Sequence, residues 1–518
     1  MNRRLCDLLP GLPLELVRGA PETLIHDLTE DSRTVTPGCL FVARPGLKSD
    51  GRAFVADALA RGAVAVLTDD PSVPVASAAL LVSAQLPLAT ALLAERFLGS
   101  PSRGLHLMGV TGTNGKTTTV HLVHQLLNRA GSRCGLIGTV QVDDGFSLRP
   151  GTLTTPMPID LSRILARMVD AGCRSAVMEA SSHALHQGRT AALSFRTGLF
   201  TNLTGDHLDY HKTMENYAAA KSILFERLPS AADGGCAIAN FEDPWSPRVL
   251  RDCRARLIGF GFGEPPAAFT ARTSEVLTAR ILRMSVRGTR AHFTGLGIDA
   301  DLDLPLVGRH NVANAMGAAI LALQCGLPAD RVLESLSSCA PPAGRMEPVF
   351  VPGAPDPEFT VLVDYAHTDD ALDNVLRAAR GIVLPPGRLI VLFGCGGDRD
   401  RTKRPRMAAA ACSRADLVWI TSDNPRTESP DAIIAEILAG VPSGYGGRVK
   451  VEVDRRTAIR NLVAMEAQPR DVIVLAGKGH EDYQIIGTTK RPFDDRAIAR
   501  EAMAERFGVA LAAGAAVP

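Results

Sequence analysis

The stretch GVTGTNGKTTT at residues 109–119 constrains the fold of this chain more than any other. It overlaps the end of the apolar run LHLMGV (105–110) and leads into VHLVHQLLNRAG (120–131), whose closing glycine is a common helix terminator. A buried strand that passes through a glycine-rich loop into a helix is typical of α/β folds. We therefore expect a mostly parallel sheet covered by helices.

The same loop has the chemistry of a phosphate-binding site. Gly112 and Gly115 let backbone N–H groups approach an anion, Lys116 adds a full positive charge, and Thr117 offers a hydroxyl to Mg²⁺. The usual spacing G-x-x-x-x-G-K is exceeded by one residue when counted from Gly109. ATP binding is expected, in a subclass other than the standard P-loop kinases, and a plain glycine-rich turn is the alternative. The residues expected to contact ATP in this loop are Gly112, Thr113, Asn114, Gly115, Lys116, Thr117 and Thr118.

Apolar strand candidates recur along the whole chain, separated by helical stretches. Near-continuous apolar strands predict parallel sheets covered on both faces. Turn-rich segments at 97–104 and 339–345 divide the chain. We expect three α/β domains: a small N-terminal one at 1–102, a central P-loop-type one at 103–341 with a mostly parallel sheet, and a Rossmann-like C-terminal one at 342–518.

Composition excludes several classes of partner. A chain of 518 residues is too long for one hydrophobic core, and its net charge of +1 gives no reason to expect nucleic acid or a membrane surface as partner. The ten cysteines are scattered without a CxxC spacing, which is typical of reduced thiols. No window approaches the roughly 18–20 apolar residues of a membrane span. We expect a cytoplasmic protein that acts as a monomer.

Three strand candidates near the C-terminus each run into a charged loop: RLIVLFG into GGDRD, DLVWITS into DNPRTE, and DVIVLAG into KGHED. Ligands of open α/β sheets bind beyond the carboxyl ends of the strands, so these loops should converge on one pocket. Charges that are merely solvated are the alternative. The side chains expected in the pocket are Arg399, Asp423, Asn424, Arg426 and Glu481.

Eleven ordered segments carry a resemblance to a known family. They are DSRTVTPGCLFVARPG near residue 31, TGTNGKTTT, MEASSHAL (178–185), TNLTGDHLDYH (201–211), YAAAKSILF (217–225), GRHNVANAMGA (308–318), GRME (344–347), DYAHTDDAL (364–372), GGDRDRTKRP (396–405), SDNPRTE (422–428) and AGKGHED (476–482). The chain resembles the Mur ligase family, ATP-dependent amide-forming enzymes of peptidoglycan precursor synthesis, over essentially its whole length. The DNPR segment resembles that of the member that adds meso-diaminopimelate to UDP-N-acetylmuramoyl-L-alanyl-D-glutamate.

The resemblance implies a catalytic centre in which ATP phosphorylates a carboxylate and an amine attacks the acyl phosphate. It implies that Lys116, Lys221, His207 and Glu179 are catalytic. Thr117 and Glu179 would share a Mg²⁺, His207 would belong to a second Mg²⁺ site, and Lys221 would also be a Mg²⁺ ligand once CO₂ has carbamylated it. The apolar neighbours of Lys221 suggest partial burial. The alternatives are a surface or capping role for Glu179 and structural roles for Asp209 and His211.

The resemblance also implies the remaining substrate contacts. ATP would be met from both sides of a domain interface by Asn311, Arg345 and Asp364. The UDP-linked substrate would contact Ser32, Thr154, Thr155, Ser181, Gln187 and Arg189, any of which alone could be an ordinary turn or cap. Diaminopimelate would meet the five loop residues named above, together with Pro425 and Gly477. LKSD at 47–50 departs from the HQAD of some relatives.

Three other functions remain open on sequence grounds. A lysine-adding Mur ligase would be expected to lack DNPR, and a folylpolyglutamate synthase-like ligase would be expected to lack the N-terminal domain with its DSR segment. A P-loop ATPase that serves as a switch or a transporter subunit could share the phosphate loop. That last function would not explain Lys221 or the three converging loops.

Overall fold

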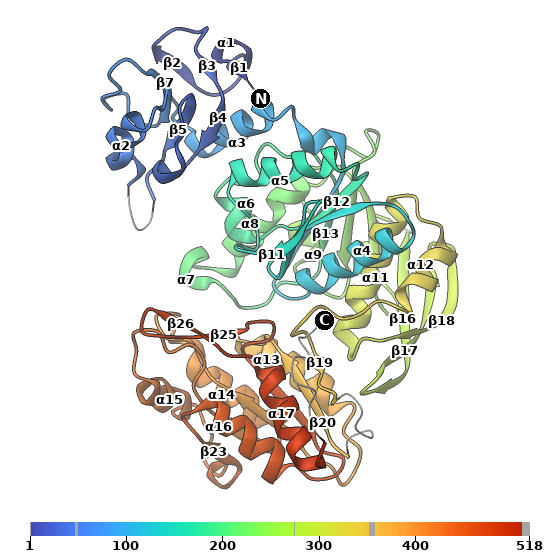
Figure 1. Cartoon of the computed structure of the whole chain (residues 1–518). Helices are drawn as coiled ribbons and strands as arrows, with labels where there is room; N and C mark the ends of the chain where they lie inside the picture. Colours follow the sequence, from blue (N-terminus) through green and yellow to red (C-terminus); the bar gives the residue numbers. More distant parts are fainter. Residues whose placement is uncertain (1, 47–49, 274, 352–357, 510–518) are drawn as a thin grey trace.

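Three large sheets, arranged one after another along the chain, organise the molecule. The computed structural model describes residues 2–46, 50–273, 275–351 and 358–509 (Figure 1). Each sheet takes its strands from one of the three expected ranges, so we keep 1–102, 103–341 and 342–518 as proposed domain limits. Most of the LKSD segment, at 47–49, lies outside the described residues.

The N-terminal sheet has five strands in the order β2-β7-β6-β5-β4, parallel except for β2. Its strands are β2 (Glu15–Arg18), β4 (Asp27–Thr29), β5 (Cys39–Ala43), β6 (Ala65–Thr68) and β7 (Ala79–Val82), beside a small pair β1 (Arg3–Arg4) and β3 (Leu24–Ile25). The helices are α1 (Leu5–Leu8), α2 (Val55–Ala60) and α3 (Leu86–Phe97). Apolar clusters on both faces make it an independent core.

The central sheet has eleven strands and is parallel through its middle, as the apolar strand pattern predicts. In spatial order the strands are β11 (Leu148–Pro150), β10 (Gln141–Asp143), β9 (Cys134–Ile137), β12 (Ser175–Glu179), β8 (His106–Thr111), β13 (Phe195–Phe200), β14 (Cys236–Asn240), β15 (Arg256–Phe262), β16 (Val276–Ser285), β17 (Gly288–Gly295) and β18 (Ile298–Leu304).

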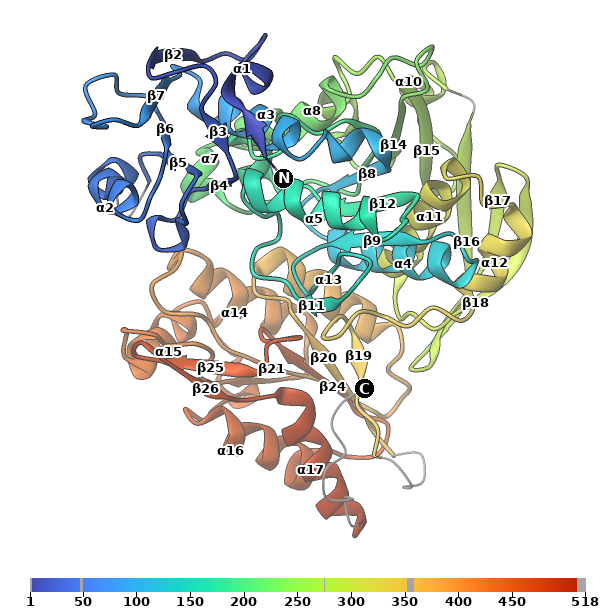
Figure 2. The same cartoon turned by 45° about the horizontal axis from the view of Figure 1, so that its top comes forward.

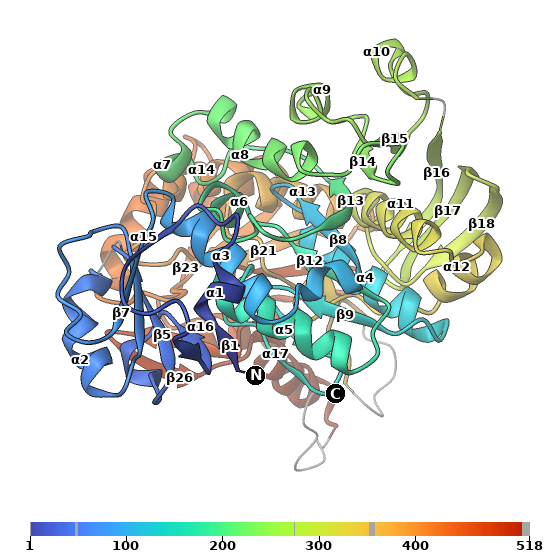
Figure 3. The ribbon, with the colours of Figure 1, turned by 90° about the horizontal axis from the view of Figure 1, so that it is seen from above.

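Helices cover both faces of the central sheet and enclose two apolar clusters. They are α4 (Lys116–Arg129), α5 (Pro158–Asp170), α6 (Ser182–His186), α7 (Leu208–His211), α8 (Met214–Glu226), α9 (Ser246–Val249), α10 (Ala267–Thr270), α11 (Arg309–Gln324) and α12 (Ala329–Leu336). Helix α5 also packs against α3, which places the N-terminal region beside the central sheet (Figure 3).

The antiparallel arm β16–β18 was not expected from the sequence. Burial alternates along β17 and β18, and charged residues such as Arg290 and Asp301 occupy exposed positions. Strands with one solvated face carry alternating rather than continuous apolar residues, so a search for apolar runs misses them. The alternation in IDADLDL (298–304) was the available signal. The arm lies on the side of the central sheet opposite the N-terminal region (Figure 3).

The C-terminal sheet has the order β19-β20-β24-β21-β22-β23 and is parallel apart from β19. Its strands are β19 (Glu347–Pro348), β20 (Thr360–Asp364), β21 (Leu389–Phe393), β22 (Leu417–Ile420), β23 (Val449–Val451) and β24 (Val472–Ala476), followed by the hairpin β25 (Tyr483–Ile486) and β26 (Thr489–Pro492). The helices are α13 (Asp369–Arg380), α14 (Lys403–Arg414), α15 (Pro430–Leu438), α16 (Arg455–Arg460) and α17 (Asp495–Phe507).

Two apolar clusters again flank this sheet, so its Rossmann-like layering agrees with the expectation. Figure 2 shows α13 and α14 on the side of the C-terminal region that faces the other two regions. All ten cysteines are free. Within the described part of the chain, no helix is both long and apolar enough to cross a membrane.

Candidate active site

The loop between β8 and α4 is shaped so that only glycine fits at two of its positions. Gly112 has a φ of 147° and Gly115 a φ of 88°, in a region that other residues rarely adopt. A Cβ on Gly112 would lie 1.9 Å from Thr201 Oγ1, and one on Gly115 would lie 2.3 Å from Asn314 Oδ1. The backbone can therefore approach a phosphate closely at the N-terminus of α4, which itself attracts anions.

Two lysines share one carbonyl oxygen in this loop. Lys116 Nζ donates to Gly112 O and Thr113 O, at 2.8 Å each, and Lys221 Nζ donates to Gly112 O at 2.8 Å. Lys221 is 1% exposed and lies against the ring of Tyr217, so its burial is complete rather than partial. Burial, and then the charge of Lys116, holds the pKa of Lys221 well below its usual range. A neutral amine at this position is a nucleophile.

Glu179 lies at the end of β12 with its carboxylate inside the protein. It is 1% exposed, accepts from Thr117 Oγ1 at 3.1 Å, and accepts from the backbone N–H of Thr139 at 2.8 Å. The interpretation of Glu179 as a surface or capping residue is therefore wrong. A hydroxyl and a carboxylate beside a phosphate loop are the oxygen ligands that Mg²⁺ prefers, so these residues fit that ion.

His207 precedes α7 in a left-handed conformation, with a φ of 55°. Its Nε2 lies 3.4 Å from Asp206 Oδ2, and although the side chain is 45% exposed, partial desolvation lowers the pKa of the imidazole. His211 instead shares a hydrogen bond of 3.0 Å with Ser182 Oγ and stacks on Tyr217, which supports its structural interpretation. Asp206, which the sequence did not single out, lines the same cavity as His207.

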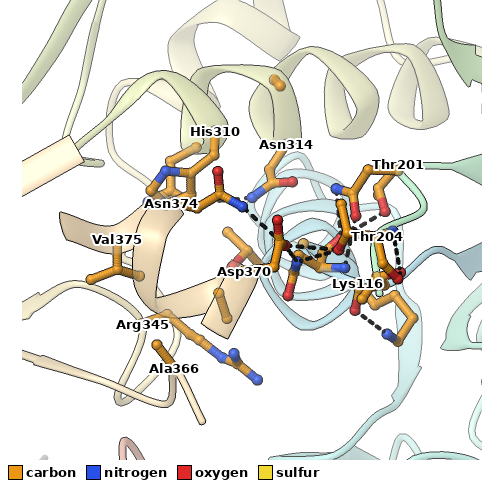
Figure 4. Close-up of a pocket in the computed structure, with 18 of the residues that line it drawn as sticks. Lys116, Thr201, Thr204, His310, Asn314, Arg345, Ala366, Asp370, Asn374 and Val375 are labelled. Carbon is orange, nitrogen blue, oxygen red and sulfur yellow. Dashed lines mark hydrogen bonds between the residues drawn. The ribbon is translucent and has the colours of Figure 1, made fainter. Parts of the chain in front are cut away.

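Nine of the ten residues expected around ATP line a cavity of about 910 Å³ between the central and C-terminal regions, and Gly112 is the one that does not (Figure 4). Arg345 lies over the ring of Tyr365 and donates to Thr117 Oγ1 at 3.4 Å, while its buried Nε has no hydrogen-bond partner among the described residues. Asn311 donates to Val307 O. Asp364 accepts from two backbone N–H groups, and burial raises the pKa of its carboxyl.

A carboxylate that sequence reasoning missed joins the two regions at this cavity. Asp370, in the first turn of α13, accepts from Asn114 Nδ2 at 2.9 Å and from Thr204 Oγ1 at 2.7 Å. Figure 4 shows Asp370 and Thr204 approaching each other from opposite sides of the cavity. The motif DYAHTDDAL contained Asp370, but its partners lie more than a hundred residues away in sequence and could not be read from it.

Five of the six residues expected for the UDP-linked substrate form one polar cluster. Thr155 Oγ1 donates to Glu179 O at 2.7 Å and accepts from Ser181 N. Arg189 donates to Gln187 Oε1 and to Thr155 O. The fifth residue, Thr154, accepts from Thr139 Oγ1.

Ser32 lies in the N-terminal region, and among the described contacts none joins its side chain to that cluster. An ion pair of 2.7 Å between Asp27 Oδ1 and Arg163 Nη2 joins the two regions directly. Glu30 lies 3.8 Å from Arg44 Nη1 within the N-terminal region. Burial raises the pKa of Glu30, whereas the positive charges of Arg44 and of Arg189 in the central region lower it. Glu30 and Arg44 were not anticipated from the sequence.

The three C-terminal loops do converge, because β24, β21 and β22 are parallel neighbours. Asn424 Nδ2 donates to Glu481 Oε2 at 2.9 Å, and Arg426 Nη1 donates to Gly397 O at 2.8 Å. Asp423 and Asn424 are buried, so they are not merely solvated charges. Arg399 is exposed and, among the described contacts, donates only to the carbonyl of its neighbour, which fits the solvated alternative.

Backbone conformation holds this pocket in place. Arg426 has a φ of 51°, and its N–H and C=O bond to Ile485 O and Gly487 N in the β25–β26 hairpin. Gly477 has a φ of 111°, and its N–H donates to Asp364 O. This bond links the pocket to the cavity that Asp364 lines. Pro425 packs closely, since a Cβ on Gly397 would lie 1.9 Å from Pro425 O.

Fold and site together define the class of protein. A phosphate loop with two lysines and oxygen ligands faces, across an interface, a second pocket in the loops of a Rossmann-like sheet. Such an arrangement suits an enzyme that uses a nucleoside triphosphate to join two substrates.

Comparison with known proteins identifies the family. Family models match residues 24–94 (Mur ligase family, catalytic domain), 110–322 (Mur ligase middle domain) and 344–479 (Mur ligase, glutamate ligase domain). The chain therefore belongs to the Mur ligase family and is an ATP-dependent ligase. Similar proteins include the UDP-N-acetylmuramoyl-L-alanyl-D-glutamate–2,6-diaminopimelate ligases of Parasynechococcus marenigrum and Geobacillus thermodenitrificans. They are 44% and 42% identical to it, over 98% and 97% of this chain and 100% of each relative.

Comparison with solved structures agrees with this family assignment. A structure of UDP-N-acetylmuramoyl-L-alanyl-D-glutamate–2,6-diaminopimelate ligase is 30% identical, with a TM-score of 0.68 over 98% of this chain and 99% of that one. The folylpolyglutamate synthase of Mycobacterium tuberculosis, solved with ADP and AMPPCP, is 20% identical, with a TM-score of 0.59 over 82% and 96%. The second likeness shows the shared fold alone.

Proposed function

We propose that this ligase adds meso-diaminopimelate to UDP-N-acetylmuramoyl-L-alanyl-D-glutamate, through an acyl phosphate, in cytoplasmic peptidoglycan precursor synthesis. The observation that carries the proposal is the set of converging loops around Asp423, Asn424 and Arg426, in which Asn424 donates to Glu481 and Arg426, with a φ of 51°, donates to Gly397 O. The names of relatives that are 42–44% identical over almost the whole chain support it.

The chain's own groups suit the chemistry that this reaction needs. A triphosphate facing a carboxylate concentrates negative charge, which Lys116 and Arg345 can neutralise from opposite sides of the cavity. Mg²⁺ would be held by Thr117, Glu179 and His207 and by a carbamate on Lys221, and when bound it would neutralise phosphate charge. Closure of the C-terminal region over the cavity would exclude water from the acyl phosphate. The proposal includes catalysis by a monomer.

Selectivity for diaminopimelate over lysine follows from the end of the amino acid remote from the attacking amine. Meso-diaminopimelate carries a second carboxylate and ammonium there, which Arg426 on one side and Asp423 and Glu481 on the other can bind. Lysine has no distal carboxylate and would leave the guanidinium of Arg426 desolvated and unpaired. Such a loss costs on the order of several kcal/mol, which corresponds to roughly a thousandfold discrimination.

Phosphate release with the UDP-linked dipeptide, ATP, Mg²⁺ and a panel of amino acids tests this function. We expect turnover with meso-diaminopimelate and about a thousandfold lower kcat/KM with L-lysine. In Arg426→Ala, kcat/KM for meso-diaminopimelate should fall to near the lysine value while KM for ATP stays unchanged. A rate with L-lysine equal to that with diaminopimelate would overturn the substrate assignment, and turnover with a folate substrate in place of the UDP-linked one would favour the folylpolyglutamate synthase-like alternative.

A further inference from the structure

A buried lysine without an assigned role lies among the three C-terminal loops. Lys478 has no exposed surface. Its Nζ lies 3.3 Å from Asp423 Oδ1 and 3.5 Å from Glu481 Oε2. It also donates to Asn424 Oδ1 at 3.1 Å and to Tyr483 O at 2.7 Å. Lys478 therefore contacts the two acids and the amide that the proposed function gives to the amino acid.

The charges in this cluster do not cancel. Two carboxylates face one ammonium, which leaves one negative charge without a partner among the described groups of the cluster. Asp423 Oδ1 is buried and accepts no hydrogen bond from the described part of the chain. A buried charge without a partner is costly, so the cluster is complementary to a ligand group that carries one positive charge.

Other charged or titratable groups that act on the two acids leave this balance in place. Arg455 is paired with Asp495 inside the protein, and Arg426 donates to a loop carbonyl, where it is available to a carboxylate. Tyr365, Tyr483 and Cys395 are uncharged at neutral pH, since their ordinary pKa values lie above neutrality and burial raises them further. The surrounding groups are Arg426, Arg455, Asp495, Tyr365, Tyr483 and Cys395.

Lys478 and the backbone N–H of Ile485 together determine which way the Asn424 amide faces. Asn424 Oδ1 accepts from both Lys478 Nζ and Ile485 N, the latter at 2.9 Å. Its Nδ2 must then be the end that faces Glu481, to which it donates at 2.9 Å. A rotated amide would set its N–H groups against two donors. The lysine therefore helps to hold the amide, and through it the carboxylate of Glu481, in one orientation.

We propose that Lys478 is a positioning residue for the amino-acid ligand: it cancels the charge of one of two carboxylates, of which Asp423 is buried and Glu481 half-buried, and it helps to orient Asn424, so that the pocket accepts a single ammonium group. The inference rests on the proposed function, because it takes the pocket as the amino-acid site. It adds the residue that sets the charge of that site.

A pH effect follows from the same arrangement. Burial and the nearby charge of Asp423 raise the pKa of Glu481, whereas Lys478 lowers it. Without the lysine, the pKa of Glu481 rises further and a proton competes with the ligand's ammonium. The KM for the amino acid should then begin to rise at a higher pH on acidification than in the unaltered enzyme.

A double-mutant cycle on Lys478→Met and Glu481→Gln tests the charge balance. The readout is KM and kcat for meso-diaminopimelate, from phosphate release by the full chain between pH 6 and 9. Each single variant should raise KM at least about tenfold. Lys478→Met leaves two surplus negative charges in the cluster, whereas Glu481→Gln leaves none. The double variant has one surplus charge again, so its KM should lie below that of Lys478→Met, with little change in kcat. Its pH dependence should also be lost.

Lys490→Met is the matched control, because Lys490 is an exposed lysine whose Nζ lies 3.5 Å from the ring centroid of Tyr483 on the same hairpin. It should leave KM unchanged. If Glu481→Gln raises KM by the same factor with and without Lys478, the lysine sets no charge and the inference is overturned. Circular dichroism checks whether the two variants that carry Lys478→Met fold. If neither the single nor the double variant folds, the role of the lysine is purely structural and the inference is overturned as well. Lack of phosphate release by the unaltered enzyme would instead refute the proposed function.

Discussion

At the scale of single residues, burial changes what a side chain can do. Lys221 sits in a helix whose sequence resembles a surface segment, yet it is enclosed and shares the carbonyl of Gly112 with Lys116. Two ammonium groups on one oxygen repel, and desolvation adds to the cost of their charge. The amine of Lys221 is therefore neutral over a wider pH range than an exposed lysine, and its lone pair can attack CO₂. A carbamate on Lys221, as proposed above, would form in this way with the release of one proton.

We predict that the enzyme in ¹³C-bicarbonate shows a carbamate carbon signal by NMR that Lys221→Ala lacks. Turnover in that variant should fall by about 10²–10³-fold or more, since a preorganised charge at the phosphate site is lost. Because the pKa of Lys221 is lowered, the signal should persist to a lower pH than for an ordinary lysine. Lys212→Ala, which removes an exposed lysine, should keep both signal and turnover. A carbamate signal that survives in Lys221→Ala would contradict the assignment.

At the scale of secondary-structure elements, one buried ion pair ties two helices to the C-terminal sheet. Arg455 in α16 and Asp495 in α17 are both inaccessible, with Nε–Oδ1 at 2.9 Å and Nη2–Oδ2 at 2.6 Å. Arg455 Nη2 also donates to Ala476 O at the end of β24. The ion pair thus holds the end of β24, the strand that leads into the amino-acid pocket.

We predict that Asp495→Ala destabilises the C-terminal region by about 3–5 kcal/mol, because it leaves a buried guanidinium without its counter-ion. The double variant Arg455→Met/Asp495→Leu, which removes both charges, should recover most of that loss. Urea unfolding followed by Trp419 fluorescence, in a Trp245→Phe background, isolates the C-terminal sheet. Equal destabilisation by the single and double variants would show that packing, not charge, governs this contact.

At the scale of the whole molecule, Asp370 is a latch between the C-terminal region and the phosphate loop. Its carboxylate accepts from Asn114 and Thr204 of the central region. The latch therefore bears on the loop that should hold ATP, and we infer that it would couple nucleotide binding to the approach of the amino-acid pocket.

We predict that Asp370→Ala lowers kcat and raises KM for ATP, each by about tenfold, because the closed arrangement loses a hydrogen-bonded carboxylate. Small-angle X-ray scattering with a non-hydrolysable ATP analogue should give a larger radius of gyration than for the unaltered enzyme. The control is Asp373→Ala on the same helix, where Asp373 pairs with Arg414 inside the C-terminal region. An unchanged radius and KM in Asp370→Ala would show that closure does not depend on the latch.

Local sequence patterns predicted the parallel part of the fold and the outline of the site. Apolar runs located β8, β21, β22 and β24, because a strand buried on both faces must be apolar along its length. They missed the arm β16–β18, whose exposed face carries charges. Glycine and lysine spacing identified the phosphate loop, since few other residues could adopt its conformation.

The sequence by itself therefore determined which loops carry the chemistry and, through resemblance, which family they belong to. Only the tertiary structure decided how the side chains in those loops are partnered. It buried Lys478 between Asp423 and Glu481, left Arg399 in solvent, and brought Asp370 to Asn114. Contacts between residues far apart in sequence depend on how sheets and helices pack, and the charge and orientation of a buried group follow from that packing rather than from its neighbours along the chain.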